Sequence, residues 1–101
     1  MDYAIEAGGE ETVVRLSGRL TFNDHAQFRA LIRAMIGHPA RRQVIDLERL
    51  EFVDSAGLGM LLIAREEMAN IESTLVLRHP QGQVKRVLGV ARLSQIIAIE
   101  D

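Results

Sequence analysis

The sequence predicts an α/β domain built on a mixed β-sheet, and three observations lead to this fold class. Val44–Leu47 is a short apolar run bounded by charged residues, which is typical of a central strand covered on both faces. A helical stripe precedes it, formed by Phe28, Leu31, Ile32, Met35 and Ile36. Strand-like and helix-like segments follow the order ββαβαβαβ, so we expect right-handed crossovers between the later strands.

The first two strands are expected over Tyr3–Ala7 and Thr12–Leu16, joined by a hairpin turn at residues 8–11. In the second strand apolar and polar residues alternate, as in a sheet with one wetted face. Gly18 is expected to end that strand. Asn23-Asp24 then offers an N-cap for the first helix, which the Gly-His-Pro sequence at residues 37–39 stops.

The second half of the chain continues this alternation. Residues 50–53 lead from the central strand into Asp54-Ser55, where a second helix begins and runs to about Asn70. Ser73–Arg78 is expected to be a strand, and Val84, Val87 and Leu88 mark a short helix that ends near Gly89. A last strand is expected over Ile96–Ile99.

Length and composition limit the classes of function. A chain of 101 residues is expected to form a single domain, residues 1–101. The net charge of −2 offers no general attraction for nucleic acid or anionic lipid. No cysteine is present, no apolar run is long enough to span a membrane, and the N-terminus does not resemble a signal peptide. We therefore expect a cytoplasmic protein without membrane insertion or nucleic-acid binding.

The most informative segment is Asp54–Gly59, with the sequence DSAGLG. Asp54 and Ser55 are both N-cap residue types, and a helix disfavours each of the two following glycines by about 1 kcal/mol relative to alanine. Missing side chains would allow another backbone or a bulky ligand to come close. A phosphate on Ser55 would lie at the positive end of the helix dipole. Ser55 can therefore accept a phosphoryl group without disrupting its own helix.

Apolar residues surround the first two turns of this helix. We expect one stripe to pack on the sheet, formed by Leu58, Leu61, Leu62 and Met68. Met60, Ile63 and Ala64 would then lie on the other side, near the serine. Two interpretations stay open: a protein-binding face beside a modifiable hydroxyl, or a helix buried on two sides.

The segment Phe52–Leu62 resembles the F-[IVM]-D-S-[SA]-G-[LI]-G signature of STAS domains, and more specifically that of the bacterial anti-sigma factor antagonists, also called anti-anti-sigma factors. Other segments resemble the same family over nearly the whole chain. They are Leu16–Leu20 for L-x-G-x-L, Val44–Leu47 for the central strand, Val84–Leu88 for the late helix, and Ala91–Leu93 where the family has S/T-G-L.

The resemblance implies a STAS fold and a partner-switching role in transcription regulation and signal transduction. In that family the unphosphorylated antagonist binds an anti-sigma factor, usually a serine-protein kinase of the GHKL ATPase type, and so frees the sigma factor. The kinase phosphorylates the signature serine, here Ser55, and a PP2C-type phosphatase restores binding. No cofactor, metal or catalytic residue is implied.

The resemblance also suggests which residues contact the partner. They are Thr21, Asn23, Asp24, His25, Asp54, Ser55, Ala56, Gly57, Leu58, Gly59, Met60 and Ile63. Where the family commonly continues with Asp and then Thr or Ser after the second strand, this chain has the sequence Thr21–His25, and Asp24 is the candidate for the acidic role. The chain ends soon after its last strand, so the C-terminal helix of many members is expected to be absent or reduced.

Three alternatives stand beside this interpretation. A hydrolase elbow needs Gly-x-Ser-x-Gly, but Val53 stands at the first glycine, and the three histidines are expected at the surface with no acidic partner. A receiver-domain site at Asp46 lacks the acidic pair and the lysine, so we expect Asp46 to cap a loop or to pair with an arginine. The third alternative keeps the fold: STAS proteins also serve as subunits of lipid-transport ABC systems, as signalling scaffolds or as transporter tails.

Overall fold

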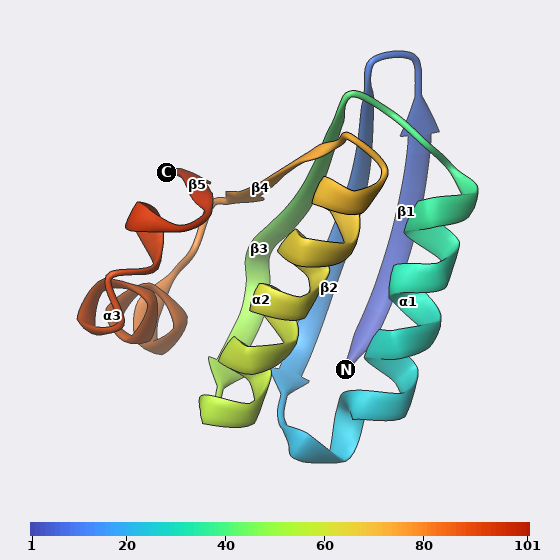
Figure 1. The fold of residues 1–101 in the computed structure, drawn as a ribbon. Coiled ribbons are helices and arrows are strands. Elements are labelled where there is room, and N and C mark those ends of the chain that lie inside the picture. The colour runs from blue at the N-terminus through green and yellow to red at the C-terminus, as the bar shows by residue number, and fades with distance from the viewer.

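The computed structural model describes all 101 residues and contains one five-stranded sheet in the order β1-β2-β3-β4-β5 (Figure 1). The strands are β1 Asp2–Gly8, β2 Glu11–Leu20, β3 Arg42–Val53, β4 Thr74–Arg78 and β5 Ala98–Glu100. The helices are α1 His25–Gly37, α2 Ser55–Asn70 and α3 Gly82–Val90, with 3₁₀ turns η1 Phe22–Asp24 and η2 Leu93–Gln95. β1 pairs antiparallel with β2, and all later pairs are parallel. The predicted α/β fold with a mixed sheet is confirmed.

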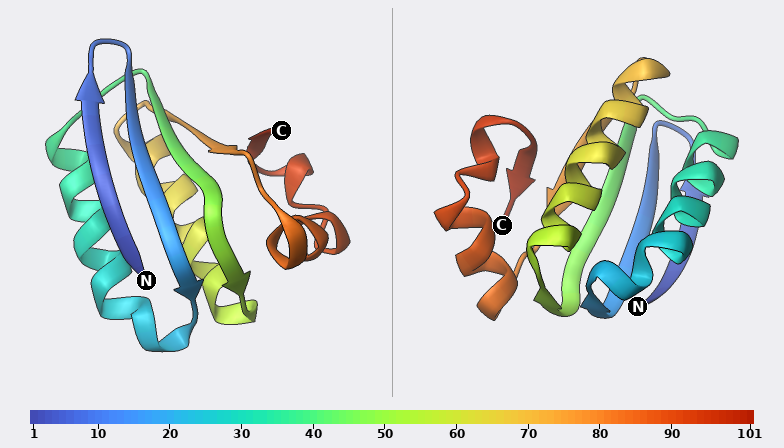
Figure 2. Two further views of the ribbon diagram at one scale, coloured as in Figure 1. Left: turned by 180° about the vertical axis from the view of Figure 1, so that it is seen from behind. Right: turned by 60° about the horizontal axis from the view of Figure 1, so that its bottom comes forward.

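Helices α1 and α2 cover one face of the sheet, and α3 lies to the side, beyond the end of β4 (Figures 1 and 2). The core lies between this face and the two helices, and it extends to α3 and η2 through Val84, Leu88 and Leu93. Its largest fully buried side chains include Phe28, Leu31, Met35, Leu61 and Met68 from the helices and Leu16, Ile45 and Leu47 from the strands. The stripe predicted for α1 is buried as expected except at its last member, Ile36, which is 37% exposed.

The second strand is longer than predicted. Gly18 does not end β2, which continues to Leu20. Gly18 has a φ of +84°, a conformation that favours glycine, and the pairing register with β3 shifts between Gly18 and Arg19. Gly18 thus marks an irregularity inside the strand, and the extension brings Leu20 beside the start of α2.

The last predicted strand is also corrected. Instead of a strand over Ile96–Ile99, the chain forms the turn η2 and only then the short strand β5. The Ile97 amide donates to the Leu93 carbonyl at 2.8 Å, so the first two isoleucines belong to a helical turn. Arg92 precedes this turn with a φ of +54°, at the position where the STAS motif has glycine. A left-handed residue here reverses the chain after α3 and directs it back to the sheet.

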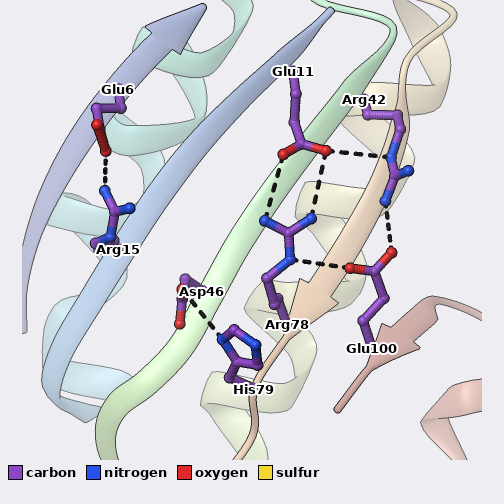
Figure 3. Close-up of polar contacts among 8 residues, drawn as sticks. All are labelled: Glu6, Glu11, Arg15, Arg42, Asp46, Arg78, His79 and Glu100. Atoms are coloured by element: carbon purple, nitrogen blue, oxygen red, sulfur yellow. Dashed lines mark hydrogen bonds and ion pairs between the residues drawn. The ribbon is translucent and has the colours of Figure 1, made fainter.

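The face of the sheet opposite α1 and α2 carries no helix (Figure 2), yet two of its valines are buried. Val44 and Val76 are 0% and 3% exposed, and the strand register places them in one row with Val13. Arginines and glutamates from the two neighbouring rows close an ion-pair ring across this row (Figure 3). The ring contacts are Arg42–Glu11 at 3.7 Å, Glu11–Arg78 at 3.4 Å, Arg78–Glu100 at 3.0 Å and Glu100–Arg42 at 2.7 Å. Because these contacts span the valine row, the charged side chains cover it in place of a helix.

The ring makes stability depend on pH. Hydrogen bonds from Arg78 and then Arg42 lower the pKa of Glu100 below its ordinary value of 4.5. Its stabilising contribution is therefore complete above pH 4.5 and is lost as the pH falls through the lower value of the folded protein. We expect Glu100→Gln to lower the urea midpoint at pH 7. Between pH 5 and pH 3 the midpoint of this variant should fall less than that of the wild type. Glu51→Gln, at an exposed residue that forms no ion pair, is the matched control. A Glu100→Gln profile parallel to that of the wild type would contradict this account.

Candidate functional site

Ser55 lies where the longest strand meets the longest helix. β3 ends at Val53, and Asp54 has the extended backbone of an N-cap residue, with φ −100° and ψ −177°. Its Oδ1 accepts a hydrogen bond from the Gly57 amide at 2.7 Å, and the Leu58 amide donates to the Asp54 carbonyl at 3.0 Å. Ser55 is the first residue of α2 and is exposed. The predicted helix start is confirmed, and Asp54 caps it.

Asp54 also holds the loop that precedes α1. Its second carboxylate oxygen, Oδ2, accepts from the Phe22 amide at 3.2 Å, across 32 residues of sequence. One carboxylate therefore joins the start of α2 to the segment Thr21–His25. The structure thus brings together the two segments that the sequence singled out separately, Thr21–His25 and Asp54–Gly59.

Asp24 organises the same loop from within. Its Oδ2 accepts from the Thr21 amide at 2.8 Å and from the Thr21 hydroxyl at 3.2 Å, and the amino group of Met1 lies 3.2 Å from Oδ1. Burial opposes the charge, but these hydrogen bonds outweigh it, so the pKa of Asp24 is lowered from 3.8. The predicted capping role is corrected in one respect: Asp24 stands at the N-cap position of α1, but its side chain turns back to Thr21 rather than capping that helix.

The two signature glycines have different environments. A Cβ at Gly57 would lie 2.5 Å from the Leu20 carbonyl oxygen and 2.6 Å from Cγ2 of Val53. Gly57 is buried, and its missing side chain allows α2 to approach the ends of β2 and β3. A Cβ at Gly59 would meet no atom within 4 Å. The predicted close approach of another backbone is therefore found at Gly57, whereas Gly59 leaves open space.

The apolar faces of α2 differ from the prediction. The buried stripe consists of Gly57, Met60, Leu61, Ala64 and Met68. Met60 and Ala64 were expected on the outer side but are 8% and 0% exposed, while Leu58 and Leu62 are only partly buried. The reason is that α2 packs on α1 as well as on the sheet, which turns its buried stripe toward Met60. Ile63 is 54% exposed, as expected for the outer face.

Two hollows flank α2, one on each side. A small one of about 90 Å³ lies between α1 and α2 and is lined by His25, Phe28, Arg29, Ile32, Met60 and Ile63. A wider, shallow groove of about 360 Å³ lies between α2 and α3 and is lined by Leu58, Arg86, Val87, Val90 and Ala91. Met60 thus contributes to the wall of a hollow rather than to an exposed rim.

Phe22 is a feature of the site that the sequence reasoning did not single out. Its side chain is 67% exposed, and its ring stacks on the His25 ring with 5.7 Å between centroids. Its amide is held by Asp54, so an exposed aromatic ring stands in a fixed place beside the start of α2. The signal available in the sequence was a lone aromatic residue within a polar loop, the kind of residue that is enriched at protein interfaces.

The expectations for the histidines and for Asp46 are only partly met. His25 and His38 are exposed, but His79 is partly buried and its Nδ1 lies 3.6 Å from Asp46 and 3.9 Å from Glu48. The Oδ1 of Asp46 accepts from the Glu48 amide at 2.9 Å within β3, where the pairing with β2 is irregular, so Asp46 does not cap a loop as expected. Arg15 and Arg78 are its partners on the neighbouring strands, but the ion-pair contact of its carboxylate is with His79 (Figure 3). No group of three or more His, Cys, Asp or Glu side chains is arranged to hold a metal ion, and no helix is long and apolar enough to cross a membrane.

Comparisons with known proteins agree with this fold. The family model described as "Mlab, STAS domain" matches residues 3–99. A STAS-domain containing protein of Pseudomonas aeruginosa is 30% identical over 93 residues, covering 92% of this chain and 91% of that protein. The anti-sigma F factor antagonist of Lysinibacillus sphaericus is 34% identical over 89 residues, covering 86% and 76%. The phosphorylated Bacillus cell fate determinant SpoIIAA has a TM-score of 0.70 at 27% identity, covering 97% of this chain and 90% of SpoIIAA. Its unphosphorylated form gives 0.71 at 25%, covering 99% and 87%.

Proposed function

The chain belongs to the STAS domain family, and we propose that it is an anti-sigma factor antagonist whose binding is switched off by phosphorylation of Ser55. The observation that carries the proposal is the exposed Ser55 at the first position of a capped helix, in a segment with the DSAGLG signature. SpoIIAA, an anti-sigma factor antagonist similar to this chain, has been solved in both phosphorylated and unphosphorylated forms. The role is regulatory rather than enzymatic.

The physical basis of the switch is a change of charge at a docking surface. Phosphoserine adds a charge of about −1.5 to −2, which the positive end of the α2 dipole tolerates within the free protein. The same charge would stand beside Asp54 and the exposed Phe22, where a partner would have to desolvate it. Burying an unmatched charge costs several kcal/mol, enough to reverse a binding equilibrium.

The partner in this proposal is an anti-sigma factor with serine-kinase activity of the GHKL type, and a PP2C-type phosphatase removes the phosphate. The docking surface consists of the residues predicted from the sequence together with Phe22. Gly59 offers open space and Ile63 an exposed apolar side chain. Gly57 and Met60 are buried, so they contribute to the shape of the surface rather than to direct contacts.

The proposal is tested by capturing the partner and then mapping the phosphate. The unphosphorylated chain, immobilised and exposed to an extract of its own host, is expected to retain an ATPase of the serine-kinase type. Incubation of that kinase with ATP should add one phosphate at Ser55, located by peptide mass spectrometry, and none to Ser55→Ala. Phosphate at another residue would contradict the proposal. Capture of an ABC transporter ATPase instead would favour the lipid-transport alternative.

A further inference from the structure

The strand that leads to Ser55 has an unpaired edge. β3 pairs with β2 as far as Val53, but it pairs with β4 only as far as Asp46. The amide and carbonyl of one strand residue point to the same side, so residues beyond Asp46 that face β4 lack a strand partner. Helix α3 packs against β3 along this edge. A buried backbone group without a hydrogen-bond partner destabilises the folded state, so the edge needs substitutes for the missing strand.

Gln83, in the first turn of α3, supplies one such substitute for a strand partner. Its Oε1 accepts from the Val53 amide at 3.0 Å, and its Nε2 donates to the Val53 carbonyl at 3.0 Å. A primary amide carries a donor and an acceptor side by side, so it can bind a strand residue as the next strand would. The Gln83 side chain therefore takes the place of a β4 residue at the very end of β3.

We infer that Gln83 is a positioning residue for the phosphoacceptor, because it fixes the end of β3 from which Asp54 and Ser55 emerge. Val53 directly precedes Asp54, whose carboxylate caps Gly57 and holds Phe22. A displaced Val53 would therefore move both the helix cap and the loop. The inference rests on the proposed function for its meaning, but the positioning itself can be measured on the protein alone.

Hydrogen exchange separates local positioning from general stabilisation. In Gln83→Ala, the Val53 and Gly57 amides should exchange at least about 10-fold faster than in the wild type, while Ile45, in the fully paired part of β3, changes much less. Gln81→Ala is the matched control, since Gln81 is exposed and its side chain donates only to the His79 carbonyl, at 3.3 Å. Equal acceleration at Val53, Gly57 and Ile45 would overturn the inference in favour of a general structural role.

A pH profile of Gln83→Glu provides the second test. A carboxylate still accepts from the Val53 amide, but it repels the Val53 carbonyl, and only its protonated form can donate a hydrogen bond there. The Ser55 and Gly57 amide resonances of this variant should differ from those of the wild type at pH 7 and return toward them near pH 4. Shifts that do not change with pH would count against a positioning role of the two Gln83–Val53 hydrogen bonds.

A functional measurement distinguishes the inference from the proposed function. With the kinase that phosphorylates the wild type, Gln83→Ala should show at least about a 10-fold lower kcat/KM at Ser55, at a temperature where it stays folded, and Gln81→Ala should match the wild type. If Gln83→Ala is phosphorylated as efficiently as the wild type, the inference fails and the proposed function stands. If the wild type is not phosphorylated at Ser55 but the exchange pattern appears, the proposed function fails and the positioning stands.

Discussion

Replacing Gly57 with alanine is expected to lower the free energy of unfolding by about 3 kcal/mol. The new Cβ would lie 2.5 Å from the Leu20 carbonyl oxygen and 2.6 Å from Cγ2 of Val53. Neither neighbour can move aside without a large cost in free energy, because one is backbone of β2 and the other is a buried side chain at the end of β3. Overpacking of this kind typically costs about 1–3 kcal/mol, and a clash with backbone lies at the upper end. Urea unfolding followed by circular dichroism measures the change.

Gly59→Ala is the matched control, two residues along the same helix. Nothing lies within 4 Å of its Cβ position, so the substitution should gain helix propensity of about 0.5–1 kcal/mol. The two alanine variants are thus expected to move the unfolding midpoint in opposite directions. Equal midpoints would mean that the close approach of α2 to the strand ends is not rigid. The control has a second use: an alanine at Gly59 that weakens partner binding without loss of stability would place Gly59 in the docking surface.

The second large effect is expected on binding. Ser55→Asp should weaken the complex with the anti-sigma partner by at least about 100-fold, or about 2.7 kcal/mol, because an exposed hydroxyl is replaced by a charge that the partner must desolvate. The variant itself should be as stable as the wild type or slightly more stable, since an acidic residue in the first turn of α2 interacts favourably with the helix dipole. Ser55→Ala should bind within a few-fold of the wild type.

Isothermal titration calorimetry with the captured partner, together with urea unfolding of each variant, tests this prediction. Ser55→Asp that binds as tightly as Ser55→Ala would rule out a mechanism based on charge. Weaker binding by both variants would instead indicate that the hydroxyl itself makes a contact in the complex. A large loss of stability in Ser55→Asp would show that the helix start does not tolerate the charge, contrary to the capped geometry at Asp54.

Local patterns in the sequence were sufficient to predict most of the fold. The helix start at Asp54-Ser55, the stop at Gly37 and the alternation of strands and helices were predicted correctly because capping and periodicity act within a few residues. The errors at Gly18 and at Ile96 have one cause. Whether a strand continues or a turn intervenes there depends on pairing with β3 and β4, which residues next to them in sequence do not encode.

The candidate site was located by sequence, but its organisation was not. Both glycines carried the same prediction, and only the packing of α2 against Leu20 separates the buried Gly57 from the open Gly59. Likewise, the stripe that faces the core includes Met60 rather than Leu58, because α1 covers α2 from a second side. Helical periodicity shows that a stripe exists, but neighbouring elements decide which stripe is buried.

What the sequence alone determined is the place and chemistry of Ser55: a serine at a helix start, behind a capping aspartate, in a segment that resembles the STAS signature. What only the tertiary structure decided is what holds that serine in position. The backbone amide of Phe22 bonds to the Asp54 carboxylate across 32 residues, and the side-chain amide of Gln83 bonds to the Val53 backbone across 30. Such contacts depend on strand register and on the point where β4 ends and the chain leaves the sheet. These are properties of the assembled sheet rather than of any local stretch of sequence.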